Sequence, residues 1–232
     1  MFIIKSVFLL PLRCILFLLV GVLLFFITSN TFEELSKWWT IVCVACNILT
    51  IAALFLICRN KGMKFSGFIN YTKGKTTFKS VVITVLVMLV VGMAGLLFAG
   101  WLIHGEIPYL PEQMIQPMPV WVLIASVLLL SLTTVLAEDG LYLGVINQSD
   151  FKLTVALSAF FYAVQHSFIP IVPDFSFMLY RFISFLPLTV VMCIWYRKTK
   201  NPLPFMMGHF ILNIATVSQI IMITASPTLF IR

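Results

Sequence analysis

Long uninterrupted apolar runs are the feature that most constrains the fold of this 232-residue chain. Seven such runs, each about 18 to 25 residues long, could cross the hydrocarbon core of a bilayer as helices. They cover residues 8–27, 39–58, 81–101, 120–146, 153–172, 175–196 and 203–223. Backbone in lipid must satisfy its own hydrogen bonds, and no alternating pattern typical of a barrel is present. The sequence therefore predicts an all-α, polytopic transmembrane helical bundle of about seven spans, within a range of six to eight.

Composition supports lipid as the solvent of most of the chain. Hydrophobic residues make up 61% and charged residues 10%, against roughly 45–50% and about 25% in soluble domains. This size predicts one membrane-embedded domain over residues 1–232. The first run, with Lys5 and Arg13 near its start, superficially resembles a secretory signal. Because no small-residue cleavage site precedes Asn30, we expect it to remain as the first span.

Charges between the runs predict the orientation of the bundle. The net charge of +7 sits in short connecting segments, so we expect contact with the lipid bilayer and no nucleic-acid partner. Segment 59–79 carries six Lys or Arg, whereas segment 102–119 carries Glu106 and Glu112 and no Lys or Arg. The first is expected in the cytoplasm and the second outside, and the basic cluster at 197–200 agrees. A multi-pass cell-membrane protein with a cytoplasmic N-terminus and an external C-terminus follows.

The five cysteines lie in or beside apolar runs. Cys43 and Cys46 form a CxxC, which in a soluble chain would suggest zinc or redox chemistry. Inside a hydrophobic helix they are expected to pack as small apolar residues. No disulfide framework is predicted.

Few ionisable residues fall inside the runs, and such residues are costly enough in a membrane to suggest function. Apart from Arg13 near the start of the first run, they are Glu138, Asp139, His166, Arg181 and His209, and the amide Asn213 follows His209 by one helical turn. Counting about 1.5 Å per residue puts Glu138, His209 and Asn213 at similar depth, with His166 deeper. We therefore expect a cavity open to the cytoplasm with His166 as its floor.

This set of side chains suits hydrolysis of an amide. A carboxylate in an apolar cavity can take a proton from water, and a neutral histidine can position that water. A second histidine with an asparagine can donate hydrogen bonds to the developing oxyanion. Glu138, His166 and His209 could instead hold a divalent metal such as zinc. Each residue also has a structural reading: Glu138 as a helix-end carboxylate, the histidines and Tyr162 as packing residues, and Arg181 as an interfacial anchor.

Three short motifs resemble those of the CPBP family, also called the Abi or CAAX-protease-like family of intramembrane endopeptidases. The family patterns EExxxR, FxxxH and HxxxN read here as Glu138-Asp139 to Leu143, Tyr162 to His166, and His209 to Asn213. The likeness covers residues 120–223. It implies that Glu138 activates water with the help of His166, that His209 and Asn213 form the oxyanion site, and that Asp139 and Tyr162 support them.

Two departures from the first motif keep a second hypothesis open. Asp139 stands where the family has Glu, and Leu143 where it has Arg, so Asp139 needs another partner, for which Arg181 is one candidate. The resemblance implies a protease acting near the cytoplasmic face on a membrane peptide or protein, in peptide processing, bacteriocin immunity or cell-envelope regulation. The alternative is an inactive scaffold that binds a membrane or cell-wall protein partner. A small transporter is disfavoured because no pair of broken helices is apparent.

Overall fold

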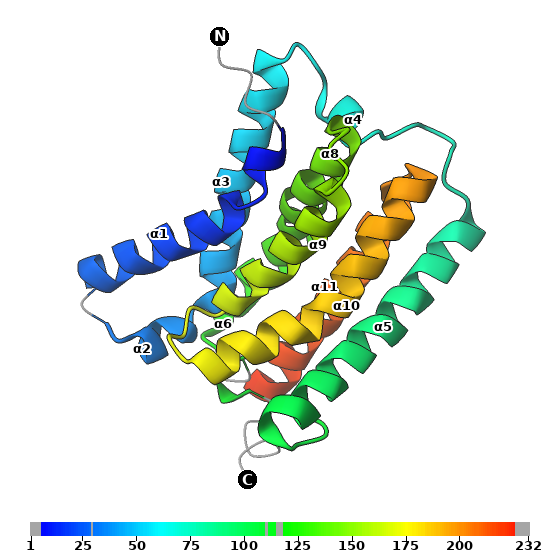
Figure 1. Cartoon of the computed structure of the whole chain (residues 1–232). Helices are drawn as coiled ribbons and strands as arrows, with labels where there is room; N and C mark the ends of the chain where they lie inside the picture. Colours follow the sequence, from blue (N-terminus) through cyan, green and yellow to red (C-terminus); the bar gives the residue numbers. More distant parts are fainter. Residues whose placement is uncertain (1–5, 29, 110, 115–117, 226–232) are drawn as a thin grey trace.

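The computed structural model describes residues 6–28, 30–109, 111–114 and 118–225, and every regular element in these residues is helical. Figure 1 shows one bundle of long helices joined by short segments. The all-α prediction is confirmed. Both chain ends, including Lys5 and the C-terminus beyond Ala225, lie outside the described residues.

Six helical segments among the described residues are long and apolar enough to cross a membrane. They are α1 (Leu12–Thr28) together with the short 3-10 helix η1 (Ser6–Leu9) before it, α3 (Trp39–Asn60), α5 (Phe78–His104), the continuous segment Val120–Gln148, α10 (Phe175–Thr199) and α11 (Leu203–Ala225). The Val120–Gln148 segment joins α6 (Val120–Ala125), the π-helix η3 (Ser126–Leu130), α7 (Ser131–Thr134), the π-helix η4 (Val135–Asp139) and α8 (Gly140–Gln148). These segments correspond to six of the seven predicted runs.

The prediction of a continuous spanning helix over residues 153–172 is wrong. Its helix α9 (Thr154–Val164) has 11 residues and is followed by the 3-10 turn η5 (Gln165–Phe168). At about 1.5 Å per residue α9 covers roughly half of the hydrocarbon core. Pro170 explains the early end, because proline clashes with the carbonyl four residues earlier in a helix. The chain still travels from the end of α8 to the start of α10 at the opposite end of the bundle (Figure 1).

Helix α10 lies between α5 and α9 and packs on both. At one close contact between α10 and α5, Gly95 lies against the backbone carbonyl of Ser184, where any side chain would collide. Helix α11 also packs along α5. The two short helices α2 (Phe32–Ser36) and α4 (Phe65–Phe68) lie in the connections, and α4 buries Phe68 against Gly144 of α8.

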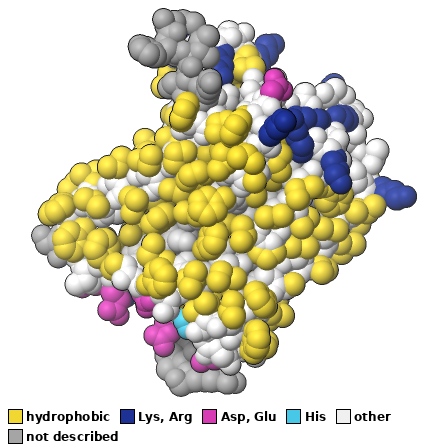
Figure 2. Space-filling view, viewed as in Figure 1, with side chains coloured by type: hydrophobic (Ala, Val, Ile, Leu, Met, Phe, Trp, Pro, Cys, Tyr) yellow, Lys and Arg dark blue, Asp and Glu magenta, His cyan; other side chains and the backbone are white. Residues whose placement is uncertain are grey.

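The described charges outside the bundle interior separate to its two ends, with a broad apolar belt between them (Figure 2). The end where α3, α8 and α10 finish carries Arg59, Lys61, Lys64, Lys73, Lys75, Lys79, Lys152, Arg197, Lys198 and Lys200, with Asp150 as its acid. The opposite end carries Glu33, Glu34, Glu106, Glu112 and Asp174, with Lys37 as its base. We call these the basic end and the acidic end. The belt has the form expected of a surface in contact with lipid.

All five cysteines are free and buried. Cys43 and Cys46 of α3 belong to an apolar cluster with Phe17 of α1 and Val122 of α6. This burial agrees with the expectation that Cys43 and Cys46 pack as small apolar residues.

Candidate functional site

Glu138 and Asp139 lie together on the π-helix η4, which interrupts the fourth spanning segment. Their exposed fractions are 1% and 0%. Consecutive residues of an α-helix point about 100° apart. A π turn, closed by i→i+5 bonds, is wider, and such turns occur often at functional sites. The wide turn lets both carboxyl groups face the bundle interior.

Arg13 of α1 is the ionic partner of Glu138. Its Nη2 donates to Glu138 Oε1 at 2.8 Å, and the guanidinium is fully buried. From sequence alone Arg13 counts as a charge near the start of the first span, so this role was missed. The signal was present, since Arg13 lies inside an apolar run, where an ionisable group needs a buried partner.

The remaining Arg13 donors connect α1 to η5 and to α3. Nε donates to Gln165 Oε1 on η5, and Nη1 donates to Asn47 Oδ1 at 2.8 Å and to Thr50 Oγ1 at 3.3 Å on α3. Asn47 in turn donates to Thr134 Oγ1 at 2.9 Å, on the helix that leads into η4. Arg13 therefore fixes the carboxylate of Glu138 relative to α1, α3 and the turn that carries His166.

The second oxygen of Glu138, Oε2, faces two histidines. It lies 3.9 Å from His166 Nε2 and 4.0 Å from His209 Nε2, which is too long for direct hydrogen bonds. Oε2 is buried and accepts no hydrogen bond from any described residue. Separations of this size are those that one bridging water molecule spans.

Hydrogen bonding sets the tautomer of His166. Its Nδ1 lies 2.9 Å from the backbone carbonyl of Tyr162, which can only accept, so Nδ1 carries the proton. In the neutral ring Nε2 is then an acceptor directed toward Glu138. The ring is held by Phe185, which stacks on it with 3.6 Å between ring centres.

Asp139, Tyr162 and His209 form a second buried group. The Tyr162 hydroxyl donates to Asp139 Oδ1 at 2.6 Å. His209 Nδ1 lies 3.3 Å from the same oxygen and 3.1 Å from the Tyr162 hydroxyl. Since the hydroxyl proton is used on the carboxylate, Nδ1 of His209 is the donor in both contacts. In the neutral ring Nε2 is then an acceptor, whereas in the imidazolium both ring nitrogens donate and Nε2 donates toward Glu138.

A cavity of about 310 Å³ lies beside these groups. Of the six candidate residues, Glu138, Tyr162, His166, His209 and Asn213 line it, and Asp139 lies behind Tyr162 and His209. The side-chain nitrogen of Asn213 is buried and donates to no described residue. The structure therefore brings the predicted set together, with an unpaired acceptor on Glu138 and an unpaired donor on Asn213 at the same cavity.

The cavity lining extends toward the acidic end, whereas the sequence predicted an opening at the basic end, which it assigned to the cytoplasm. Its lining includes Pro108, Tyr109, Pro111 and Met114, which belong to the segment after α5 at the acidic end. Toward the basic end α11 closes directly on α5, because a Cβ on Gly208 would come within 2.6 Å of Met88 Sδ. The depth of each residue, counted from the helical rise, does not show toward which end of the bundle the cavity extends.

The sequence suggested Arg181 as an interfacial anchor or as the partner of Asp139, and both predictions are wrong. It is 5% exposed and lines the cavity. Its Nε donates to the backbone carbonyl of His166 at 3.4 Å, and its Cζ lies 4.8 Å from the centre of the Phe185 ring. Leu143, which takes the place of the family arginine, is fully buried among apolar residues around α8. Glu138 pairs instead with Arg13, and Asp139 with Tyr162 and His209. One buried oxygen of each carboxylate, Oε2 and Oδ2, has no hydrogen-bond partner among the described residues.

Glu138, His166 and His209 are the ligands expected if zinc is bound. In the described part of the chain no group of three or more His, Cys, Asp or Glu is arranged to hold a metal ion. Ligands of a tetrahedral zinc ion, about 2.0–2.2 Å from the metal, lie roughly 3.4 Å apart. The separations of 3.9 and 4.0 Å at Glu138 Oε2 are wider than this. The spacing suits a bridging water better than a zinc ion.

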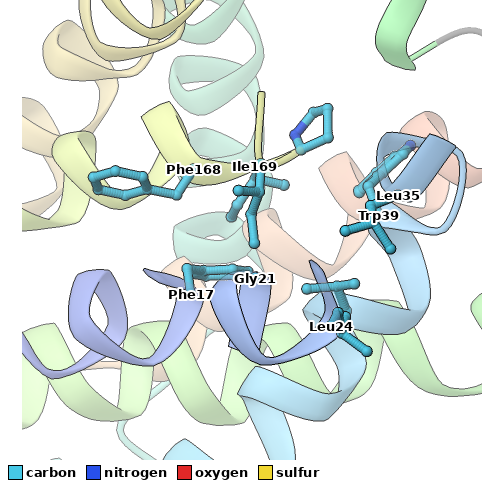
Figure 3. A pocket seen from close by; sticks show the side chains of 10 residues that line it. Phe17, Gly21, Leu24, Leu35, Trp39, Phe168 and Ile169 are labelled. Carbon is cyan, nitrogen blue, oxygen red and sulfur yellow. The ribbon is translucent and has the colours of Figure 1, made fainter. Parts of the chain in front are cut away.

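A small apolar hollow shows how α1 is seated near the site (Figure 3). Phe17 and Gly21 of α1 lie against Ile169 and Ile171, which follow η5, and a Cβ on Gly21 would come within 2.6 Å of Ile171 Cδ1. The hollow measures about 10 Å³, room for roughly one water molecule. This contact holds the helix that carries Arg13 against the segment that carries His166.

Comparison with protein-family models, curated proteins and solved structures finds no match to this chain.

Proposed function

We propose that this chain is an intramembrane endopeptidase that hydrolyses a peptide bond of a membrane-associated peptide or protein, with Glu138 as the general base. The observation that carries the proposal is the position of Glu138 Oε2. It is buried, unpaired, and faces His166 and His209 across a gap of 3.9 to 4.0 Å at the wall of a cavity. This is where a nucleophilic water would lie.

In the first step, a water molecule in that gap donates hydrogen bonds to Glu138 Oε2 and His166 Nε2. Its oxygen attacks the carbonyl carbon of the peptide bond while a proton passes to Oε2. Arg13 holds Oε1, so the carboxylate presents a single oxygen in a fixed direction. The water therefore needs little reorganisation before attack.

The negative charge that develops on the carbonyl oxygen needs donors. Asn213 Nδ2 is free to donate. His209 donates through Nε2 as an imidazolium, whose Nδ1 proton is directed at Asp139 Oδ1 and the Tyr162 hydroxyl. When the tetrahedral intermediate collapses, the C–N bond breaks and the proton on Glu138 passes to the leaving amine. The products are a carboxylic acid and an amine, and Glu138 is regenerated.

The likeness of the three motifs to the CPBP family supports the same assignment of roles. The departures at Asp139 and Leu143 are compatible with activity, because Asp139 is hydrogen bonded and Arg13 supplies an arginine from another helix. Since the cavity reaches the acidic end, the substrate enters from that end rather than from the cytoplasmic face. A role in peptide maturation, bacteriocin immunity or cell-envelope regulation fits such a substrate.

The test compares membrane peptides from a deletion strain expressing the wild type, Glu138→Gln or Glu106→Gln. Glu106 is an exposed acid at the acidic end, so its variant makes the same chemical change away from the cavity. We expect cleavage products with the wild type and Glu106→Gln, and none with Glu138→Gln at equal abundance of the protein. Products that persist in Glu138→Gln would refute the proposal.

The second candidate is an inactive scaffold that binds a membrane or cell-wall protein. The observation in its favour is Leu143, because the residue packs in the core where the family motif has a charge. If the chain is a scaffold, Glu138→Gln should complement the deletion strain fully and still bind its partner. If the chain is a peptidase, Glu138→Gln should fail to complement the strain although the protein is equally abundant.

A further inference from the structure

Arg181 carries a buried positive charge that no described carboxylate neutralises. Its only described hydrogen bond runs to the backbone carbonyl of His166, and no described Asp or Glu lies within the 4.0 Å of an ion pair. Glu138 is already paired with Arg13, and Asp139 with Tyr162 and His209. An unpaired charge at this depth is costly, so its retention calls for a ligand.

The guanidinium borders the cavity close to the proposed site of attack. Phe185 lies against both groups: its ring stacks on His166 at 3.6 Å between centres and lies 4.8 Å from Arg181 Cζ. Much of the remaining lining is apolar and includes Met88, Leu96, Leu188 and Leu212. A ligand that matches this cavity is apolar and carries one anionic group.

We propose that Arg181 binds a carboxylate of the substrate peptide, supplied by an acidic side chain or by the peptide C-terminus. The identity of this ligand rests on the proposed peptidase function. A guanidinium fork matches the two oxygens of a carboxylate. Because an extended residue spans about 3.3 to 3.6 Å, a carboxylate held at Arg181 lies within a few residues of the bond attacked beside Glu138. Arg181 thereby sets both the substrate class and the position of cleavage.

Binding is measured on the full chain carrying Glu138→Gln, so that no probe is cleaved, in nanodiscs of phosphatidylcholine. Three apolar peptides of equal length serve as probes: an amidated peptide with one Asp, a peptide with a free C-terminus and no acid, and an amidated peptide without a carboxylate. We expect at least one carboxylate peptide to bind about tenfold or more tightly than the third. The peptide that shows this preference identifies the source of the carboxylate.

Adding Arg181→Met to the Glu138→Gln chain should abolish the preference for carboxylate peptides. The affinity for the carboxylate-free peptide should stay unchanged, and this serves as the control that the cavity is still folded. Arg181→Lys keeps the charge and should keep part of the preference. Arg59→Met, at an exposed arginine of α3, is the matched control and should keep all of it. Equal binding of the three peptides, or a preference that survives Arg181→Met, overturns the inference. Competition by phosphatidylglycerol without any peptide preference also overturns it and assigns the charge to a lipid phosphate.

The binding result is independent of cleavage. If membrane peptides are cleaved but Arg181 gives no carboxylate preference, this inference fails and the proposed function stands. If the preference is present but Glu138 proves dispensable for cleavage, the proposed function fails and the binding site remains.

Discussion

Arg13 Nη2 lies 2.8 Å from Glu138 Oε1, although the two residues are 125 positions apart in the chain. The pair is buried in the bundle, and the other donors of Arg13 are engaged by Gln165, Asn47 and Thr50. A buried ion pair is tolerated when such hydrogen bonds complete it. The pairing uses one oxygen of Glu138 and leaves the other free toward His166 and His209.

Removing one partner of this ion pair should lower the free energy of unfolding. Arg13→Gln leaves the Glu138 carboxylate buried without a counter-ion, and we expect a loss of about 3–5 kcal/mol in the free energy of unfolding, measured by SDS titration. The double variant Arg13→Gln/Glu138→Gln should lose clearly less than the sum of the two single variants. Losses that add within about 0.5 kcal/mol would show that the two groups are not coupled.

The sequence predicted the residues that meet at the cavity but not the groups that hold them. His209 and Asn213 share a helical face, and the depths of Glu138 and the histidines follow from the helical rise, so local geometry was sufficient for these. Arg13 comes from another helix, and no spacing rule relates it to Glu138. Likewise, the prediction of Arg181 as a partner of Asp139 is wrong, because the partners are a hydroxyl and an imidazole from α9 and α11.

The fold was predictable to the extent that apolar length determines it. Six runs became helices that can span a membrane. The run at 153–172 did not, since its hydrophobicity continues past the point where Pro170 ends helical hydrogen bonding. The π turn at Val135–Asp139 leaves no mark in the apolar pattern, so the side-by-side burial of Glu138 and Asp139 was not foreseen.

The Tyr162 hydroxyl should add to the stability of the protein beyond what packing of the ring contributes. Tyr162→Phe keeps the ring but removes the hydroxyl that donates to Asp139 at 2.6 Å and contacts His209 Nδ1. Because Asp139 is buried, we expect the variant to lose about 1–3 kcal/mol of unfolding free energy in the same titration. Tyr71→Phe, at a tyrosine that is 43% exposed, should be neutral and serves as the control. Equal effects of the two variants would assign Tyr162 to packing alone.

Two glycines of α5 one turn apart give a matched test of the contact with α10. At Gly92 an added Cβ meets only Leu188 Cδ2 at 3.7 Å, so Gly92→Ala should be neutral or stabilise by up to about 1 kcal/mol through helix propensity. At Gly95 it meets the carbonyl of Ser184, so Gly95→Ala should destabilise by about 1–3 kcal/mol. The thermal midpoints of the purified proteins check this. A rise in midpoint for Gly95→Ala would contradict the tight approach of the two helices.

Charge separation predicts which side of the membrane the cavity faces. The basic end should lie in the cytoplasm, which puts the acidic end and the adjacent cavity lining outside. Single cysteines at exposed positions test this: on intact cells an impermeant maleimide should label Glu106→Cys, and it should label Lys73→Cys only after permeabilisation. The native cysteines, at most 7% exposed, give little background. The reverse labelling pattern would place the acidic end in the cytoplasm, and substrate would then reach Glu138 from the cytoplasm.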